Sequence, residues 1–427
     1  MKFLIVTAWY HPFIHPRAHR WTALAEYLAA TGDEVHILCA RQRGFPQFAI
    51  VNGVHVHRSG FDSLKEVAYY LSGSKSGRGR VGAEVRRPGF AMRLANWLYN
   101  KVWKNVFFPD DACLWYFPAR RSMMRLLEQE PFDVLLSVSL PFTGHLLGLA
   151  AKRRYPALRW IADVGDPFSM QIKAPNNKRL YGRLNARLEK EVLESADAVA
   201  VTTPAMLHAF HRQFGDKVVA HMQVVPPLLH PAPGAQAHAA GNADAIGIAY
   251  FGALYAPLRT PDAFLRLLDR TVLASPTLAA RLQVHFYGEI FPEFYEKMRA
   301  QPLIRLHGLR SREEARQAMR ATDLLLNIGN ASEFQLPSKA VDYLAAGRPV
   351  VHLSYTDNDP FVAFWGDREG LLSLRAVDGD ISEADFVRWL DWLAHPPAMP
   401  DDTALIGQLQ PFLVPAIAER YRSLASG

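Results

Sequence analysis

The stretch that decides the fold runs from residue 321 to residue 351 and reads ATDLLLNIGNASEFQLPSKAVDYLAAGRPVV. Its apolar run, residues 324–328, has the pattern of a strand that is buried on both faces. Pro337 and Ser338 are typical of a helix start, whereas Gly347 followed by Pro349 is typical of a helix end. The stretch therefore predicts a strand, a helix and a second strand, which is the repeating unit of a parallel α/β sheet.

This predicted helix carries two charged residues where it starts. Lys339 and Asp342 fall in its first turn, at the carboxyl end of the buried strand, where ligands bind in open α/β sheets. First-turn amides attract phosphate, and Lys339 adds a full positive charge. Asp342 can accept hydrogen bonds from a ribose diol. The alternative is an ordinary strand–helix–strand unit whose Lys and Asp are solvated.

The stretch resembles the donor-nucleotide motif of GT-B glycosyltransferases of the family 4 type. In that motif a Pro-Ser-Lys turn precedes a helix that ends in Tyr-Leu-Ala-Ala-Gly-Arg-Pro-Val, and two glutamates are separated by seven residues. Here the second acid is Asp342, Phe334 stands where the first would fall, and Glu333 is one place early. The resemblance implies two Rossmann-like α/β domains facing across a cleft. It also implies that the donor is bound by Glu333, Pro337, Ser338, Lys339 and Asp342.

Length and composition agree with two folded α/β domains, because the chain has 427 residues, 49% of them hydrophobic and 21% charged. The two cysteines have neither metal spacing nor a pairing pattern, which favours a reducing cytoplasm. The sixteen histidines form no HxxxH or HExxH pattern, and we expect no metal and no cofactor. The amino terminus is too short for a signal peptide, and no apolar run approaches the roughly 18 residues that a membrane span needs.

The net charge of +7 is concentrated in one segment, because nine Lys or Arg and only two acids lie between residues 65 and 104. Residues 91–106 scan as an amphipathic helix with a basic face and aromatic flanks. Such an element can lie on an anionic membrane, so residues 75–108 are a candidate membrane surface. The alternative is a surface helix packed on its own domain. We expect no nucleic-acid partner.

The first domain opens with strand 2–7, helix 18–30 and strand 34–39, a right-handed βαβ start. It resembles the family opening, with Gly-Asp-Glu-Val before the second strand. Where the family has a glycine pair, this chain has His15-Pro-Arg17, so His15 and Arg17 are acceptor-side candidates; an exposed helix-start Arg is the alternative. The segment 163–168 resembles the family's Asp-x-x-Asp-Pro-Trp, which lines the cleft near the reacting sugar. Asp166 is therefore a catalytic candidate, against a simple turn aspartate before proline.

The second domain opens with strand 246–252, and its loop reaches Arg259. In the family, basic residues in this loop hold the diphosphate; Arg259 matches one of them, and Ala253 stands at the other position. Gly252 would end the strand, and Gly308 with Leu309 would form the loop beneath the base. We expect a first domain over residues 1–230, completed by a final helix at about 408–427, and a nucleotide-sugar-binding domain over 245–405.

The function that this resemblance implies is transfer of a sugar from a nucleotide-sugar donor to a glycan or lipid-linked acceptor in bacterial envelope polysaccharide assembly. It implies a retaining, metal-independent, hexosyltransferase-like enzyme with Asp166, Arg259 and Lys339 as catalytic residues, cytoplasmic or peripheral on the inner membrane face. Two alternatives stay open. One is a sugar-nucleotide 2-epimerase of the same fold. The other is a non-catalytic scaffold that binds glycan or membrane, favoured by the missing glycine pair and by Ala253.

Overall fold

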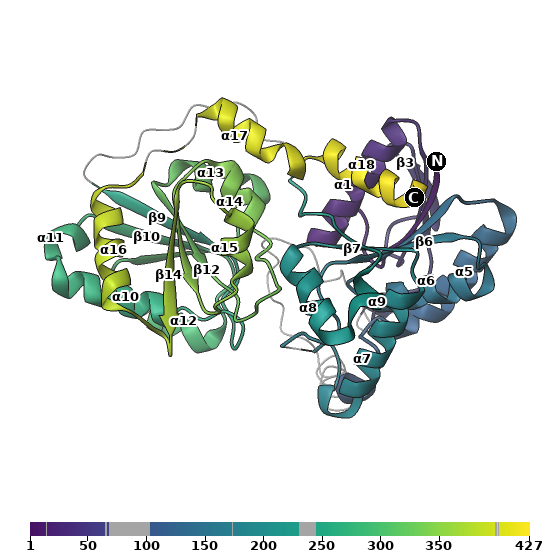
Figure 1. The fold of residues 1–427 in the computed structure, drawn as a ribbon, viewed down its shortest axis with the longest axis horizontal. Helices are drawn as coiled ribbons and strands as arrows, with labels where there is room; N and C mark the ends of the chain where they lie inside the picture. The colour runs from purple at the N-terminus through teal and green to yellow at the C-terminus, as the bar shows by residue number, and fades with distance from the viewer. Residues whose placement is uncertain are drawn as a thin grey trace. The chain divides into compact units, whose positions relative to one another are not determined.

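A computed structural model describes residues 1–13, 15–64, 66–67, 103–172, 174–229, 245–397, 399 and 401–427. The chain divides into two compact units (Figure 1). Unit 1 comprises Met1–His230 and Val414–Gly427, and unit 2 comprises Pro231–Leu413. Most of the candidate membrane segment, residues 75–102, lies outside the described residues, so the predicted amphipathic helix is represented only by its end.

Unit 1 is built on an eight-stranded sheet in the order β3–β4–β2–β1–β5–β6–β7–β8. All neighbours are parallel except β3, which pairs antiparallel with β4. The order reverses between β1 and β5, which makes this a doubly wound sheet with a switch point there. The strands are β1 (Lys2–Val6), β2 (Glu34–Cys39), β3 (Phe48–Val51), β4 (Val54–Arg58), β5 (Val134–Val138), β6 (Arg159–Val164), β7 (Ala198–Val201) and β8 (Met222–Val224).

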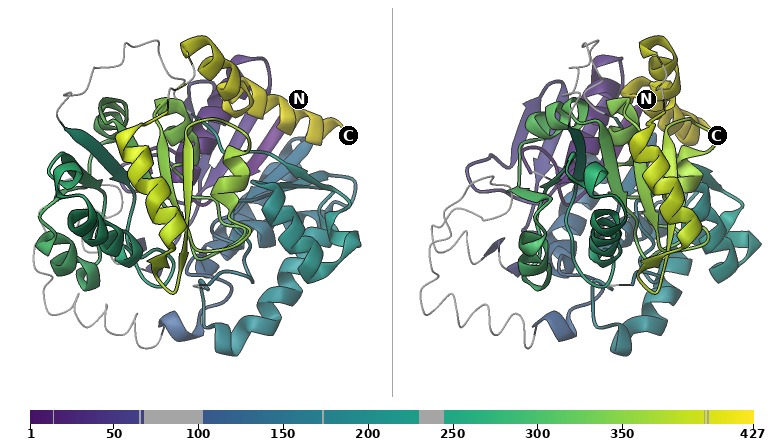
Figure 2. Two further views of the ribbon diagram at one scale, coloured as in Figure 1. Left: turned by 60° about the vertical axis from the view of Figure 1, so that its left-hand side comes forward. Right: turned by 90° about the vertical axis from the view of Figure 1, so that its left-hand side faces the viewer.

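Helices pack on both faces of this sheet (Figure 1). They are α1 (Pro16–Ala30), α4 (Lys104–Val106), η2 (Cys113–Trp115), α5 (Tyr116–Gln129), α6 (Thr143–Arg154), α7 (Lys178–Ser195), α8 (Pro204–Phe214), α9 (Asp216–Val219) and α18 (Val414–Ser426). The last helix, α18, packs on α1 and against β6, and its Ile417 and Tyr421 join the core of the sheet. Both chain ends therefore lie close together in unit 1 (Figures 1 and 2), where the Met1 amino group and Arg422 both pair with Asp33.

Unit 2 is built on a seven-stranded sheet in the order β11–β10–β9–β12–β13–β14–β15, parallel except for β15. Its strands are β9 (Ile246–Phe251), β10 (Leu282–Tyr287), β11 (Ile304–Gly308), β12 (Leu324–Ile328), β13 (Val350–Ser354), β14 (Leu371–Val377) and β15 (Asp380–Ile381). Its helices are α10 (Asp262–Ala274), α11 (Pro276–Ala279), α12 (Pro292–Ala300), α13 (Arg312–Ala321), α14 (Ala340–Ala346), α15 (Pro360–Trp365), α16 (Glu383–Ala394), α17 (Asp402–Leu409) and η3 (Gln410–Phe412). The order reverses between β9 and β12, so the prediction of two Rossmann-like units is confirmed.

Four helix boundaries differ from those expected from the sequence. Helix α1 begins at Pro16 rather than at residue 18. Helix α14 begins at Ala340, because Pro337–Lys339 first form a turn closed by Ala340 N–H to the Pro337 carbonyl at 3.0 Å, and Ser338 caps nothing. The expected single helix at about 408–427 falls on the end of α17, on η3 and on α18, with prolines at 411 and 415 near the breaks. The sequence predicts a helix only over residues 187–196, whereas α7 begins at Lys178, with the Asn177 side chain as its cap.

Candidate functional site

The centre of the candidate donor site is Arg259, which lies in the loop after β9, beside the switch point of unit 2. Its Nη2 donates to Asn330 Oδ1 at 2.7 Å, and its Nη1 donates to the Tyr250 hydroxyl at 3.3 Å and to the Ala253 carbonyl at 3.4 Å. Its Nε is buried without a hydrogen-bond partner. Among the residues that the structure describes, no carboxylate pairs with this guanidinium.

The neighbouring hydroxyl does not neutralise this charge. Burial raises the pKa of Tyr250, although Arg259 opposes the shift, so the phenol stays protonated and offers only a dipole. A side chain at Gly252 would also crowd the guanidinium, because a Cβ there would lie 3.1 Å from Arg259 Nη1 and 2.9 Å from the Tyr250 oxygen. The site is thus a half-buried cation surrounded by neutral groups, and an anionic ligand would complete it.

Two loops from neighbouring strands are joined around Arg259. The Ala331 N–H donates to the Leu258 carbonyl at 2.9 Å, so the loop after β12 is tied to the loop after β9. Asn330 continues the link, because its Nδ2 donates to the Gln335 carbonyl at 2.9 Å while its Oδ1 holds Arg259. The β12 loop that leads to Lys339 is therefore held against the loop that carries Arg259.

Lys339 and Asp342 lie together where α14 begins, and they form an ion pair at 3.0 Å. The lysine side chain is 31% exposed and the aspartate side chain 10%, so the amino group can reach a ligand more readily than the carboxylate. Tyr343 anchors the helix, because its hydroxyl donates to the Leu326 carbonyl and accepts from Phe251 N–H, both at 2.9 Å. This residue connects α14 to β12 and β9, and burial raises its pKa, which keeps the hydroxyl a donor.

The other predicted donor residues are spread along the same edge of the sheet. Glu333 accepts from Asn358 Nδ2 at 3.2 Å, which links the β12 loop to the loop after β13. Gly308 ends β11 with φ +66°, and Leu309 follows it with 59% of its surface exposed. Because β10 separates β11 from β9, these two residues belong to a different part of the edge from Arg259. Pro337 and Ser338 lie in the turn before α14.

In unit 1, the side chain of Asp163 on β6 accepts hydrogen bonds from several neighbouring side chains, and only 1% of the residue's surface is exposed. Its Oδ2 accepts from Arg17 Nη1 and from Trp21 Nε1, both at 3.1 Å, and its Oδ1 accepts from the Tyr421 hydroxyl at 2.9 Å. Arg17 is thus paired with a carboxylate, unlike Arg259. His15 acts as the cap of α1, since its Nδ1 accepts from Arg17 N–H at 3.2 Å.

Asp166 is the residue of this segment that the sequence predicts as catalytic, and it lies just beyond β6, half-buried. Asp163, Tyr250, Asn330 and Tyr421 are site residues that were not predicted from the sequence. Two of these had a visible signal in the sequence. Asp163 is the one acid of a mostly apolar strand, and Asn330 directly follows Gly329 at the end of a buried strand.

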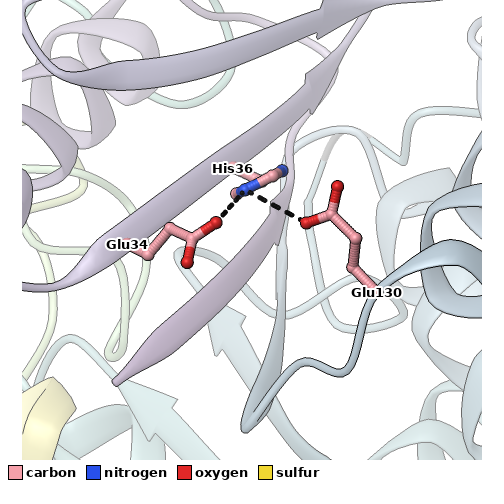
Figure 3. Close-up of side chains that lie close together, drawn as sticks. All are labelled: Glu34, His36 and Glu130. Atoms are coloured by element: carbon pink, nitrogen blue, oxygen red, sulfur yellow. Dashed lines mark hydrogen bonds and ion pairs between the residues drawn. The ribbon is translucent and has the colours of Figure 1, made fainter.

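One group of the described residues has the composition of a metal site, Glu34, His36 and Glu130 (Figure 3). His36 Nε2 lies 3.0 Å from Glu34 Oε1 and 3.9 Å from Glu130 Oε2. Lys2 already pairs with both carboxylates, at 2.9 Å from Glu34, and its hydrogen bonds lower the pKa of each. The ammonium group supplies the positive charge that a metal would bring, so this cluster at the start of β1 and β2 is better explained as an ion-pair network.

Comparisons with known proteins agree with this architecture. Residues 18–227 match the family model described as a glycosyl transferase 4-like domain. No curated protein sequence matches the chain. Within the described residues, no helix is both long enough and apolar enough to cross a membrane.

Solved structures resemble the chain over its whole length. Sucrose-phosphate synthase from Thermosynechococcus elongatus is 14% identical, with a TM-score of 0.62 over 99% of this chain and 98% of that one. WaaG, a glycosyltransferase involved in lipopolysaccharide biosynthesis, is 13% identical, with a TM-score of 0.58 over 100% of both chains. HepE from Anabaena, in complex with UDP-glucose, is 13% identical, with a TM-score of 0.56 over 100% of both.

The chain has a GT-B fold, as shown by the strand orders of its two doubly wound units and by its likeness to these solved structures. Within that fold, residues 18–227 match the glycosyl transferase 4-like domain.

Proposed function

We propose that the protein transfers a sugar from a nucleoside-diphosphate sugar to an acceptor hydroxyl. The observation that carries this proposal is Arg259, a half-buried guanidinium with neutral partners only, at the switch point of unit 2. A diphosphate provides the missing negative charge, and arginine suits phosphate because its N–H groups form a planar fork. The HepE structure in complex with UDP-glucose supports this choice of ligand class.

In the proposed reaction the bond between the anomeric carbon and the β-phosphate oxygen breaks, and the acceptor oxygen takes the sugar while losing its proton. Negative charge grows on the leaving diphosphate, and Arg259 and Lys339 stabilise it. Such preorganised charges contribute more in the transition state than in the ground state. Asp342 accepts from the ribose hydroxyls once Lys339 turns toward phosphate. We further propose retention of configuration without a metal or cofactor, with Asp166 near the reacting sugar.

The acceptor is proposed to be a glycan or a lipid-linked glycan of envelope polysaccharide assembly, which would place the protein at the inner face of the membrane. WaaG, which shares the fold, is involved in lipopolysaccharide biosynthesis, and that relation supports the proposal. On the acceptor side, Arg17 is oriented by Asp163, and His15 caps the helix that carries it.

The test is isothermal calorimetry of the full chain with UDP, GDP, ADP and CMP, followed by transfer assays with the sugar forms of whichever nucleotide binds. Arg259→Ala should weaken binding of that diphosphate by roughly 10- to 150-fold, the value of a hydrogen bond to a charged group. Arg299→Ala, at an exposed arginine of α12 in the same unit, is the matched control and should leave binding unchanged.

Two results would overturn the proposal. If none of the nucleotides binds, the non-catalytic scaffold is favoured. Ala253 already supports that alternative, because it stands where the family has a basic residue. Binding with conversion of a UDP-sugar in the absence of any acceptor would instead favour the 2-epimerase.

A further inference from the structure

The first half of α7 presents a surface that the donor site does not explain. Leu180 and Leu184, one turn apart, are 62% and 44% exposed. Ile172, in the loop before the helix, is 41% exposed. Large apolar side chains this exposed usually occur singly, whereas these lie on one short segment.

Cations surround these leucines. The exposed basic residues from the start of α7 to residue 190 are Lys178, Arg179, Arg183, Arg187 and Lys190. Arg179, Arg183 and Arg187 recur every four residues, so they form a row beside the row of leucines. The acid within this span, Glu189, faces inward and accepts from Ser169 N–H at 2.9 Å. The exposed face is therefore both basic and apolar.

The opposite face fixes how the helix is oriented. The Tyr181 hydroxyl donates to the Val106 carbonyl at 2.8 Å, and Asn185 exchanges two hydrogen bonds with Asn176, each at 2.9 Å. Because polar residues hold the inner face, the leucines cannot turn inward without breaking these bonds. The helix lies at the foot of unit 1 in Figure 1, on the opposite side from α18.

The charge pattern also opposes the intrinsic preference of a helix. The first turn of α7 contains no acid and begins with Lys178 and Arg179, which the positive end of the helix dipole disfavours. A sequence selected for helix stability alone would place acids there. The placement costs some helix stability, which is consistent with cations that serve an external partner.

We propose that this face of α7, comprising Leu180, Leu184 and the arginines 179, 183 and 187, binds the surface of an anionic lipid bilayer. The leucines would enter the interfacial region, and the arginines would contact lipid phosphates. A nucleic acid fits less well, because its bases stack on aromatic side chains, and this exposed face carries leucines instead. The surface is made only of described residues.

The location gives this surface a use that rests on the proposed function. The loop that leads to α7 leaves the carboxyl end of β6, next to Asp163 and Asp166. A lipid-linked acceptor in the bilayer would therefore present its glycan near the acceptor side of unit 1. Membrane binding itself is tested independently of that step.

The experiment is co-sedimentation of the full chain with vesicles of phosphatidylglycerol and phosphatidylethanolamine, and with phosphatidylcholine vesicles. The triple variant with Arg→Gln at 179, 183 and 187 should lose affinity for anionic vesicles by about 100-fold at low salt. The matched control is Arg→Gln at three exposed arginines of α5 in the same unit, 120, 121 and 125, which should lose less than tenfold. Equal losses in the two triples would overturn the proposal.

A second variant tests the apolar part. Leu180→Ser with Leu184→Ser should bind normally in low salt but dissociate in 0.5 M salt, where charge attraction is screened. If the leucine variant stays bound to vesicles in 0.5 M salt, the membrane assignment is wrong. It is also wrong if the variant binds vesicles as wild type does at every salt concentration and single-stranded RNA competes for the arginines. Calorimetry with nucleotide should be unchanged in all α7 variants, so failure of this proposal is distinct from failure of the donor site.

Discussion

Replacing Asn330 by aspartate would test whether the donor site depends on an arginine without a counter-ion. Asn330 Oδ1 accepts from Arg259 Nη2 at 2.7 Å, and the side chain is 6% exposed. Aspartate has the same shape, so it would pair with the guanidinium whenever no diphosphate is bound. At about 4 Å and an effective dielectric constant of about 20, two opposite charges attract by about 4 kcal/mol. The pair would compete directly with the diphosphate.

The expected loss follows from what the diphosphate must give up. A hydrogen bond to a charged group contributes roughly 1.5–3 kcal/mol, and every 1.4 kcal/mol is tenfold in affinity, so Asn330→Asp should bind the diphosphate roughly 10- to 150-fold more weakly. Asn330→Ala is the control, because it removes both hydrogen bonds of the amide but introduces no negative charge.

Calorimetry with the nucleoside diphosphate measures both variants, and circular dichroism verifies their fold. The aspartate variant should bind more weakly than the alanine variant. If the two bind alike, or if aspartate binds better, the neutral surroundings of Arg259 do not matter and the reasoning is wrong.

Three further predictions concern other parts of the molecule. Lys339→Ala should lower kcat by roughly 10²–10³ with little change in stability, since the side chain is partly exposed and acts on the leaving group. Burial lowers the pKa of His145 in the folded protein to about 4. As the pH falls below about 6.5, the imidazole is therefore protonated in the unfolded state before it is protonated in the folded state. The folded protein consequently loses stability between about pH 6.5 and pH 4. His145→Asn should therefore flatten the stability profile over that interval by about 1.4 kcal/mol per pH unit. Tyr421→Phe removes a donor from buried Asp163 and should cost about 1.5–3 kcal/mol in denaturant unfolding.

Each of these measurements has a contradicting result. Turnover of Lys339→Ala within about threefold of wild type would remove Lys339 from the site. His208→Asn, at an exposed histidine, is the control for the pH profile, and equal flattening in both variants would exclude burial as the cause. An unfolding midpoint of Tyr421→Phe equal to wild type would show that the hydroxyl is dispensable.

The fold was predictable because each strand–helix–strand unit repeats the same local pattern of buried strand, helix and terminating glycine. Helix α14 ends at Gly347, which has a left-handed conformation with φ +61°. The local sequence predicts this end, because glycine is the usual residue at such a position. The first half of α7 was missed because its inner face carries Tyr181 and Asn185 while its leucines face outward, which reverses the usual periodicity. The spacing of apolar residues along the sequence cannot predict a helix whose inner face is held by polar side-chain contacts.

The site was predictable only in part, for a related reason. Arg259 and Lys339 could be selected because cations near strand ends suggest phosphate. The contact of Arg259 with Asn330 joins residues 71 positions apart, and Tyr421 reaches Asp163 across 258 positions. No local pattern encodes such pairs, because they depend on which strands become neighbours.

The return of α18 to unit 1 has a consequence for how the protein is made. The ribosome synthesises α18 after all of unit 2, yet Tyr421 and Ile417 belong to the core beside α1. Until then the nascent first unit exposes the apolar surface that α18 will cover, including part of Trp21, whose ring contacts Tyr421 at a centroid distance of 5.0 Å. Unit 2 is one continuous segment, so all of it is synthesised before α18. The last fourteen residues thus couple completion of the first unit to translation of the whole second unit, and chains stalled after the second unit would expose a surface that chaperones and proteases recognise.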